Sequence, residues 1–150
     1  MRVLIVCTGN TCRSPMAEAI LKSQILPQDD IEVISGGIFA YEGERASKNA
    51  VLVLKEKGID ISGHTAKNIN ESVVRDADLI LTMTKAHKQT LIDIYADEAA
   101  KKTYTLCEYA QEDGDIADPY GGDVEIYRMC ASRLLSVIKK AYERIRGGEL

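Results

Sequence analysis

The feature that most constrains this chain is a cysteine that ends an apolar run and leads into a short polar loop. Residues 2–6 (RVLIV) are continuously apolar after the first position and rich in β-branched side chains, as in a strand buried within a parallel sheet. Cys7 follows, and the loop TGNTC leads to Arg13. Ser14 and Pro15 then predict a helix start, with Ser14 as N-cap and Pro15 as the first helical residue.

This loop is a predicted binding site for a phosphoryl group. Its amides and the helix N-terminus point into one concavity that attracts an anion. Arg13 adds a planar fork that matches two phosphoryl oxygens, and the same charges stabilise a thiolate on Cys7. The alternative makes Cys7 a small buried residue and Arg13 a solvated one, but Gly9 and Asn10 favour the loop. The expected phosphate-binding residues are Thr8, Gly9, Asn10, Thr11, Cys12, Arg13 and Ser14.

Composition narrows the partners and the compartment. At 150 residues the chain is expected to form one domain, 1–150. Its net charge is −4 and it has no basic run, which argues against nucleic acid as a partner. No stretch approaches a membrane span, and we expect no signal peptide because the first predicted strand begins at residue 2. The four cysteines follow no disulfide or zinc spacing, so we expect a cytoplasmic protein. We also expect a monomer without a metal or cofactor.

Strand-like and helix-like segments alternate along the chain. Strands are expected at 2–6, 31–35, 79–83 and 103–106, and helices at 15–24, 44–57, 85–95 and 123–146. This order predicts an α/β fold in which helices cover both faces of a parallel sheet. Ligands in such folds bind beyond the carboxyl ends of the strands, which is where Cys7 stands.

The chain resembles the low-molecular-weight protein tyrosine phosphatase family. The matching residues are VCTGNTCRSPMAEA at 6–19 and DPY at 118–120, and residues 35–37 (SGG) stand where the family has Ser-Ala-Gly. The resemblance implies a four-stranded parallel sheet, phosphorylated protein substrates and a phosphocysteine intermediate on Cys7. It also implies that Asp118 protonates the leaving atom and then activates water.

Other readings of these residues stay open. Asp118 precedes a proline, so a simple turn aspartate is the alternative, and Asp113, Asp115 and Asp123 lie nearby. The resemblance implies that Ser35 supports the loop. It also implies that Cys12 forms a reversible disulfide with Cys7, which would protect Cys7 from further oxidation. A small loop-packing residue is the alternative for Cys12.

Six further residues have expected positions or roles. Asn10 suits a left-handed backbone position and is expected to hold the loop in shape. Ser14 can donate its hydroxyl to the Cys7 thiolate. His64 is expected in a loop and His87 on the solvent face of a helix, while the remaining cysteines, Cys107 and Cys130, are expected to fill the core.

The expected substrate is phosphoarginine. Thr11 stands where tyrosine enzymes usually carry a larger aliphatic residue, MTKAH at 83–87 replaces a usual M-D-x-x-N, and Gly-Gly follows Tyr120. These departures resemble the bacterial protein arginine phosphatase branch. Tyr41 and Tyr120 are expected to wall the pocket, where an aromatic slot suits a phenyl ring by stacking and a guanidinium by cation–π contact.

Phosphotyrosine therefore remains the alternative substrate. Two less favoured classes are an arsenate reductase, which needs two more redox cysteines in a flexible segment, and a phosphate-binding domain without catalysis. Cys107 and Cys130 lie far apart in expected regular elements, and Arg13 with Asp118 favours turnover over mere binding.

Overall fold

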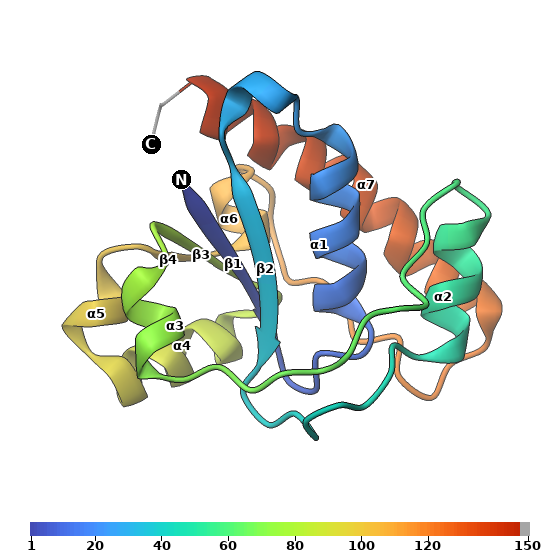
Figure 1. Cartoon of the computed structure of the whole chain (residues 1–150), viewed down its shortest axis with the longest axis horizontal. Helices are drawn as coiled ribbons and strands as arrows, with labels where there is room; N and C mark the ends of the chain where they lie inside the picture. Colours follow the sequence, from blue (N-terminus) through green and yellow to red (C-terminus); the bar gives the residue numbers. More distant parts are fainter. Residues whose placement is uncertain (148–150) are drawn as a thin grey trace.

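A four-stranded parallel sheet forms the centre of the computed structural model, which describes residues 1–147 (Figure 1). The spatial order is β2-β1-β3-β4, so the strand that precedes the phosphate loop lies inside the sheet. This confirms the predicted fold class. The strands are β1 (Arg2–Cys7), β2 (Glu32–Gly37), β3 (Leu79–Thr82) and β4 (Thr103–Thr105).

Side chains of β1 alternate between two cores because successive residues of a strand face opposite sides of the sheet. Val3 and Ile5 join the larger core, and Leu4 and Val6 join the smaller one. The larger core receives α1 (Arg13–Gln24), α2 (Lys48–Lys55), α6 (Leu106–Tyr109) and α7 (Val124–Gly147). The other face receives α3 (Glu71–Asp76), α4 (Lys85–Tyr95) and α5 (Asp97–Ala100), as Figure 1 shows.

Several predicted boundaries were wrong. The helix expected at 44–57 begins only at Lys48, because the Ser47 hydroxyl caps it by accepting a bond from the Ala50 amide (3.3 Å). Helix α1 begins at Arg13, with Cys12 in the N-cap position, so Ser14 is not the N-cap. The helix predicted at 85–95 matches α4 at both ends, and the predicted strands and remaining helices differ from the structure by one or two residues at one or both ends.

Four short elements were not predicted: a 3-10 turn at Pro27–Asp29 and the helices α3, α5 and α6. Helices of four to six residues are too short to show a periodic apolar pattern. Within residues 1–147, no helix is both long enough and apolar enough to cross a membrane.

The end of β2 packs directly against the loop after β1. The Ile38 amide donates to the Cys7 carbonyl (3.0 Å), and the Phe39 amide donates to the Thr8 carbonyl (2.9 Å). A side chain at Gly37 would place its Cβ 2.5 Å from the Thr8 carbonyl oxygen. Glycine is therefore required at this position, and it lets β2 support the phosphate loop from behind.

Candidate active site

The phosphate loop (residues 7–14) surrounds the buried sulfur of Cys7 with donors. The Asn10 amide lies 3.3 Å from Cys7 Sγ, and Ser14 Oγ lies 2.8 Å from it. Asn10 Nδ2 donates to Ser14 Oγ (2.8 Å), which leaves the Ser14 hydroxyl proton free to donate to sulfur. Both donors are placed to stabilise a negative charge on Cys7.

Asn10 shapes the loop through its backbone and its side chain. Its φ of 56° is left-handed, a region that asparagine tolerates better than most residues. Its Nδ2 also donates to Ser35 Oγ (3.0 Å), and its Oδ1 accepts from the Lys67 amide (3.0 Å). The expected support from Ser35 is thus present as a contact with the phosphate loop.

His64 holds the same turn from outside. Its Nε2 lies 2.8 Å from the Asn10 carbonyl oxygen. Because a carbonyl only accepts, Nε2 of His64 carries the proton in this contact. His64 lies in a loop as expected, but its contact with the phosphate loop was missed, because nothing adjacent in the sequence marks it.

The interior of the loop presents unused donors. The amides of Gly9, Thr11 and Cys12 find no acceptor within residues 1–147, and all three residues line a cavity. Arg13 is 5% exposed and fixed by a bond from Nη1 to the Ile116 carbonyl (2.8 Å). Amides, an arginine and a helix N-terminus on one cavity are a site for a phosphoryl group.

Asp118 reaches the same cavity from the loop before α7. Its Oδ2 lies 3.6 Å from Arg13 Nη2, and its Oδ1 accepts from the Tyr120 amide (3.0 Å). The carboxylate is half exposed and open to a ligand. The structure therefore brings Asp118 to the same cavity as Cys7 and Arg13, from which it lies far apart in the sequence.

The neighbouring aspartates have other places. Asp115 accepts from the Lys85 amide (3.0 Å) at the start of α4, and Asp123 accepts from the Ile126 amide (3.1 Å) at the start of α7. Neither these two nor Asp113 lines the cavity. Asp118 is the aspartate of this loop that can reach a ligand bound above Cys7.

The glycine pair after Tyr120 makes the turn into α7. Gly121 has a φ of +82°, and the Gly122 amide donates to the Pro119 carbonyl (2.9 Å). A Cβ on Gly122 would lie 2.9 Å from Ile126 and 3.0 Å from the Pro119 oxygen. The pair therefore permits a tight turn that places Tyr120 at the cavity.

The cavity holds about 320 Å³. The three predicted specificity residues line it: Thr11 at the loop, and the exposed rings of Tyr41 and Tyr120 at its mouth. Two more residues, Phe39 and Glu44, line the cavity and were not predicted. The sequence feature that could have identified them is their position in the glycine-rich loop after the second strand, at the carboxyl edge of the sheet. The lining residues are Cys7, Thr8, Gly9, Asn10, Thr11, Cys12, Arg13, Phe39, Tyr41, Glu44, Asp118 and Tyr120.

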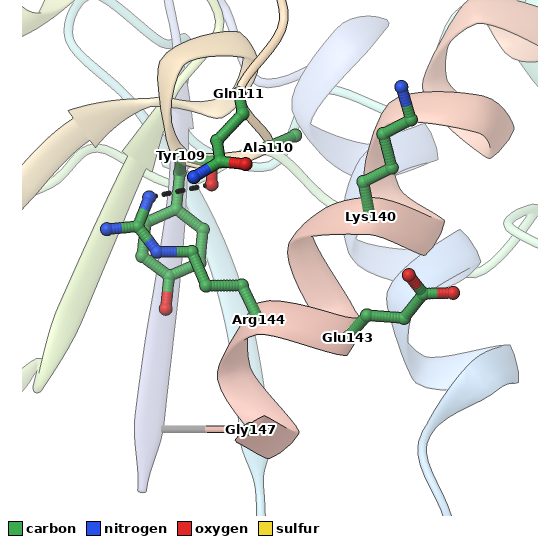
Figure 2. Close-up of a pocket in the computed structure, with 7 residues that line it drawn as sticks. All are labelled: Tyr109, Ala110, Gln111, Lys140, Glu143, Arg144 and Gly147. Carbon is green, nitrogen blue, oxygen red and sulfur yellow. Dashed lines mark hydrogen bonds between the residues drawn. The ribbon is translucent and has the colours of Figure 1, made fainter. Parts of the chain in front are cut away.

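A second pocket, of about 430 Å³, lies at the far end of α7 (Figure 2). Arg144 stacks on the Tyr109 ring, 4.2 Å from its centre, and donates to the Tyr109 carbonyl (2.8 Å). No cysteine, serine or aspartate lines this pocket. Within residues 1–147, no group of three or more His, Cys, Asp or Glu side chains is placed to hold a metal ion. The phosphate-loop cavity is thus the candidate active site.

The prediction that His87 faces solvent was wrong. Its side chain is 8% exposed, and its Nε2 lies 2.8 Å from Thr8 Oγ1. Burial of the ring, and then repulsion by Arg13, lower the pKa of His87 to about 4, although Asp118 and Asp115 oppose the shift. His87 is therefore neutral at physiological pH. A position early in a helix favoured exposure to solvent, but the first turn of α4 packs against the phosphate loop.

This lowered pKa predicts an acid-sensitive contribution to stability. Unfolded histidine titrates near 6.5, so as the pH falls the unfolded chain takes up this proton before the folded one does. The contribution of His87 is complete above about pH 6.5 and is lost progressively down to about pH 4, by about 3 kcal/mol. We expect His87→Gln to lose correspondingly less stability over this window in urea unfolding curves. Parallel curves for the two proteins would contradict a buried neutral imidazole.

The remaining cysteines differ in their surroundings. Cys12 is buried, and its Sγ lies 3.3 Å from the Tyr127 hydroxyl. Burial raises the pKa of Cys107, and raises that of Cys130 to about 12, so both thiols stay protonated and unreactive. Their buried positions confirm the prediction that they fill the core. All four cysteines are free thiols in this structure.

We expect mild peroxide to inactivate the protein reversibly through a disulfide between Cys7 and Cys12. A sulfenic acid on Cys7 condenses with a thiol in the same short loop faster than it is oxidised further. Mass mapping should find the Cys7–Cys12 bond, and thiol should restore activity. The matched variant is Cys12→Ser, which should recover far less; equal recovery would reject a protective role for Cys12.

Comparison with known proteins identifies the family. The model of the low molecular weight phosphotyrosine protein phosphatases matches residues 2–147. A protein-arginine-phosphatase of Geobacillus stearothermophilus is 44% identical over 97% of this chain and 96% of its own length. A solved low molecular weight protein tyrosine phosphatase from T. tengcongensis is 46% identical, with a TM-score of 0.91 over 96% of this chain and 99% of that one.

A further solved relative bears on the chemistry of the site. It is a cysteine-to-serine mutant of YwlE arginine phosphatase with a phosphorylated active site serine, 36% identical to this chain. Its TM-score is 0.92, over 97% of this chain and 96% of that one. The match to the family model and the identity to these relatives both extend over nearly the whole chain. The chain is therefore a phosphatase that belongs to the low molecular weight phosphotyrosine protein phosphatase family.

Proposed function

We propose that this phosphatase hydrolyses phosphoarginine in proteins through a phosphocysteine intermediate on Cys7. The observation that favours phosphoarginine as the substrate is the set of side chains that line the cavity together with Thr11. Its hydroxyl-bearing side chain shares the cavity with two carboxylates, Asp118 and Glu44. A guanidinium is planar and cationic, and it binds best where carboxylates and polar groups surround it.

The first step forms a bond between Cys7 Sγ and phosphorus and breaks the phosphorus–nitrogen bond. The loop amides and Arg13 stabilise the negative charge of the transferring phosphoryl oxygens. The proton on Asp118 passes to the leaving guanidino nitrogen, so that arginine departs with its ordinary charge. Asp118 has the reach for this transfer because its half-exposed carboxylate lies 3.6 Å from the Arg13 guanidinium.

The second step hydrolyses the intermediate. The Asp118 carboxylate takes a proton from water, the water oxygen bonds to phosphorus, and the sulfur–phosphorus bond breaks. The products are inorganic phosphate and a Cys7 thiolate, which Asn10 and Ser14 are placed to stabilise. The phosphorylated active-site serine in the YwlE mutant supports transfer of the phosphoryl group to the residue at the nucleophile position.

Phosphotyrosine is the second candidate substrate, and the rings at the cavity mouth favour it. Phe39, Tyr41 and Tyr120 are each more than three-quarters exposed and line the cavity. They would stack on a phenyl ring, although they also offer cation–π contact to a guanidinium. Relatives of similar identity include both a protein-arginine-phosphatase and a protein tyrosine phosphatase. Our preference for phosphoarginine therefore rests on Thr11 and the two acidic side chains.

Thr11→Ile should separate the two substrates. Isoleucine adds apolar bulk and removes a hydroxyl beside the atom bonded to phosphorus, where a guanidinium carries further nitrogens and a phenyl oxygen does not. We expect kcat/KM for phosphoarginine peptides to fall roughly 10–200-fold relative to that for phosphotyrosine peptides. Steady-state kinetics on both substrates with one preparation of each protein provide the measurement.

The matched control is Thr11→Val, which removes the hydroxyl at nearly constant volume. A loss for phosphoarginine in this variant assigns part of the selectivity to hydrogen bonding, and a loss confined to Thr11→Ile assigns it to space. A parallel fall of both substrates in Thr11→Ile would show that Thr11 only packs the loop.

A further inference from the structure

A half-buried contact between an imidazole and the phosphate loop has no role in the mechanism above. His87 Nε2 lies 2.8 Å from the hydroxyl of Thr8, the first residue after the nucleophile. The other ring nitrogen, Nδ1, is buried and has no hydrogen-bond partner within residues 1–147. The imidazole therefore makes only one of its two possible hydrogen bonds, and that bond is to the phosphate loop.

His87 is itself held firmly in place. Its amide donates to Thr84 Oγ1 (3.1 Å), the N-cap of α4. In the same turn, the Lys85 amide donates to the carboxylate of Asp115 (3.0 Å), a residue of the loop that also carries Asp118. The first turn of α4, which carries the ring, is thus bonded to the loop that carries Asp118, and the ring itself contacts the phosphate loop at Thr8.

Thr8 is held at a second point by its backbone. Its carbonyl accepts from the Phe39 amide (2.9 Å) on the β2 side. The peptide between Thr8 and Gly9 is trans, so the Gly9 N–H points away from that carbonyl. The Gly9 amide has no acceptor within residues 1–147, and Gly9 lines the cavity. The two anchors of Thr8 therefore set the direction of the Gly9 amide.

We propose that His87 is a positioning residue that acts through the Thr8 hydroxyl to aim the Gly9 amide at the phosphoryl group. The role rests on the proposed phosphate site above Cys7, and it applies to phosphoarginine and phosphotyrosine alike. A neutral ring suits it, because a second cation beside Arg13 would be repelled; the lowered pKa of His87 is consistent with this. Asp118 and Asp115 face the ring from the loop before α7.

The aim of an amide matters most in the transition state, where phosphoryl charge shifts onto the oxygens that it contacts. Removal of one preorganised donor costs about 10²–10³-fold in rate, so a donor that is merely misdirected should cost about tenfold. We therefore expect His87→Leu to lower kcat about tenfold for an aryl phosphate, with a smaller change in KM. His87→Gln, whose Nε2 can replace the imidazole Nε2, should restore most of this loss.

The decisive experiment is a double-mutant cycle on His87→Leu and Thr8→Val, with Thr8→Ser as the control that keeps the hydroxyl. Its readouts are kcat and the inhibition constants of orthovanadate, which mimics five-coordinate phosphorus, and of inorganic phosphate. We expect His87→Leu and Thr8→Val each to weaken the binding of vanadate more than the binding of phosphate. The double variant should lose no more kcat or vanadate affinity than the more impaired of the two single variants. Thr8 is exposed, so Thr8→Val tests the contact even if His87→Leu fails to fold.

Additive losses, or lowered thermal stability with unchanged kcat and vanadate affinity, would overturn the inference and leave His87 as a packing residue. Failure of the underlying phosphate site has a different signature. In that case inorganic phosphate would not compete with substrate in the wild-type protein, and Cys7→Ser would remain active.

Discussion

Cys7→Ser should abolish hydrolysis, with a loss on the order of 10⁴–10⁶-fold, as expected for removal of a nucleophile. A serine hydroxyl must lose its proton before it attacks, and it needs an adjacent general base to do so. The groups that contact Cys7 Sγ, the Asn10 amide and the Ser14 hydroxyl, are donors to sulfur. They offer no base to a serine hydroxyl, which slows its attack on phosphorus. Any phosphoserine that forms would then be hydrolysed very slowly, because an alkoxide leaves phosphorus far less readily than a thiolate does.

The same variant should keep its fold and its affinity for inorganic phosphate. Arg13 and the loop amides supply the binding energy, and serine is smaller than cysteine in a buried position. Thermal unfolding and phosphate titration are the controls. Retention of a few per cent of wild-type turnover in a verified variant would remove Cys7 from the nucleophile role.

Asp118→Asn should lower kcat roughly 10²–10⁴-fold for a phosphoarginine peptide, whose leaving nitrogen needs a proton. The loss should be much smaller for an activated aryl phosphate, whose leaving oxygen departs without help. The amide keeps the size of the side chain but can neither donate the proton nor later accept one from water. The wild-type pH profile of kcat/KM should be bell-shaped, and its alkaline limb should disappear in the variant.

The matched control is Asp113→Asn. Asp113 lies in the same loop, but its side chain is exposed and does not line the cavity. We expect this variant to behave like the wild type on both substrates. An unchanged pH profile in Asp118→Asn would move the acid–base role to Asp115 or Asp123.

The phosphate loop was predictable because its parts are contiguous. The cysteine, the amides, the arginine and the helix start all lie within residues 7–15, and a buried parallel strand fixes their direction. Local rules also predicted the left-handed Asn10 and the contact of Ser14 with Cys7. The prediction that Ser14 is the N-cap was wrong because the helix begins one residue before Ser14, inside the phosphate loop.

The supports from distant segments were not predictable in this way. His64 and His87 contact the phosphate loop from positions 54 and 79 residues away from their partners, and no local pattern marks either of them. His87 was expected to face solvent from its place early in a helix, which could not show that the first turn of α4 packs on the phosphate loop. Phe39 and Glu44 were missed because the course of a long loop depends on what it packs against.

The central claim is the preference for phosphoarginine, and one measurement tests it most directly. This is the ratio of kcat/KM for a phosphoarginine peptide to that for a phosphotyrosine peptide of the same flanking sequence, on one wild-type preparation. We expect the ratio to favour phosphoarginine by at least about tenfold, because Thr11 and Asp118 offer polar groups, and Glu44 a negative charge, in the cavity that would receive the guanidinium. A ratio below one would contradict the account and assign the site to phosphotyrosine.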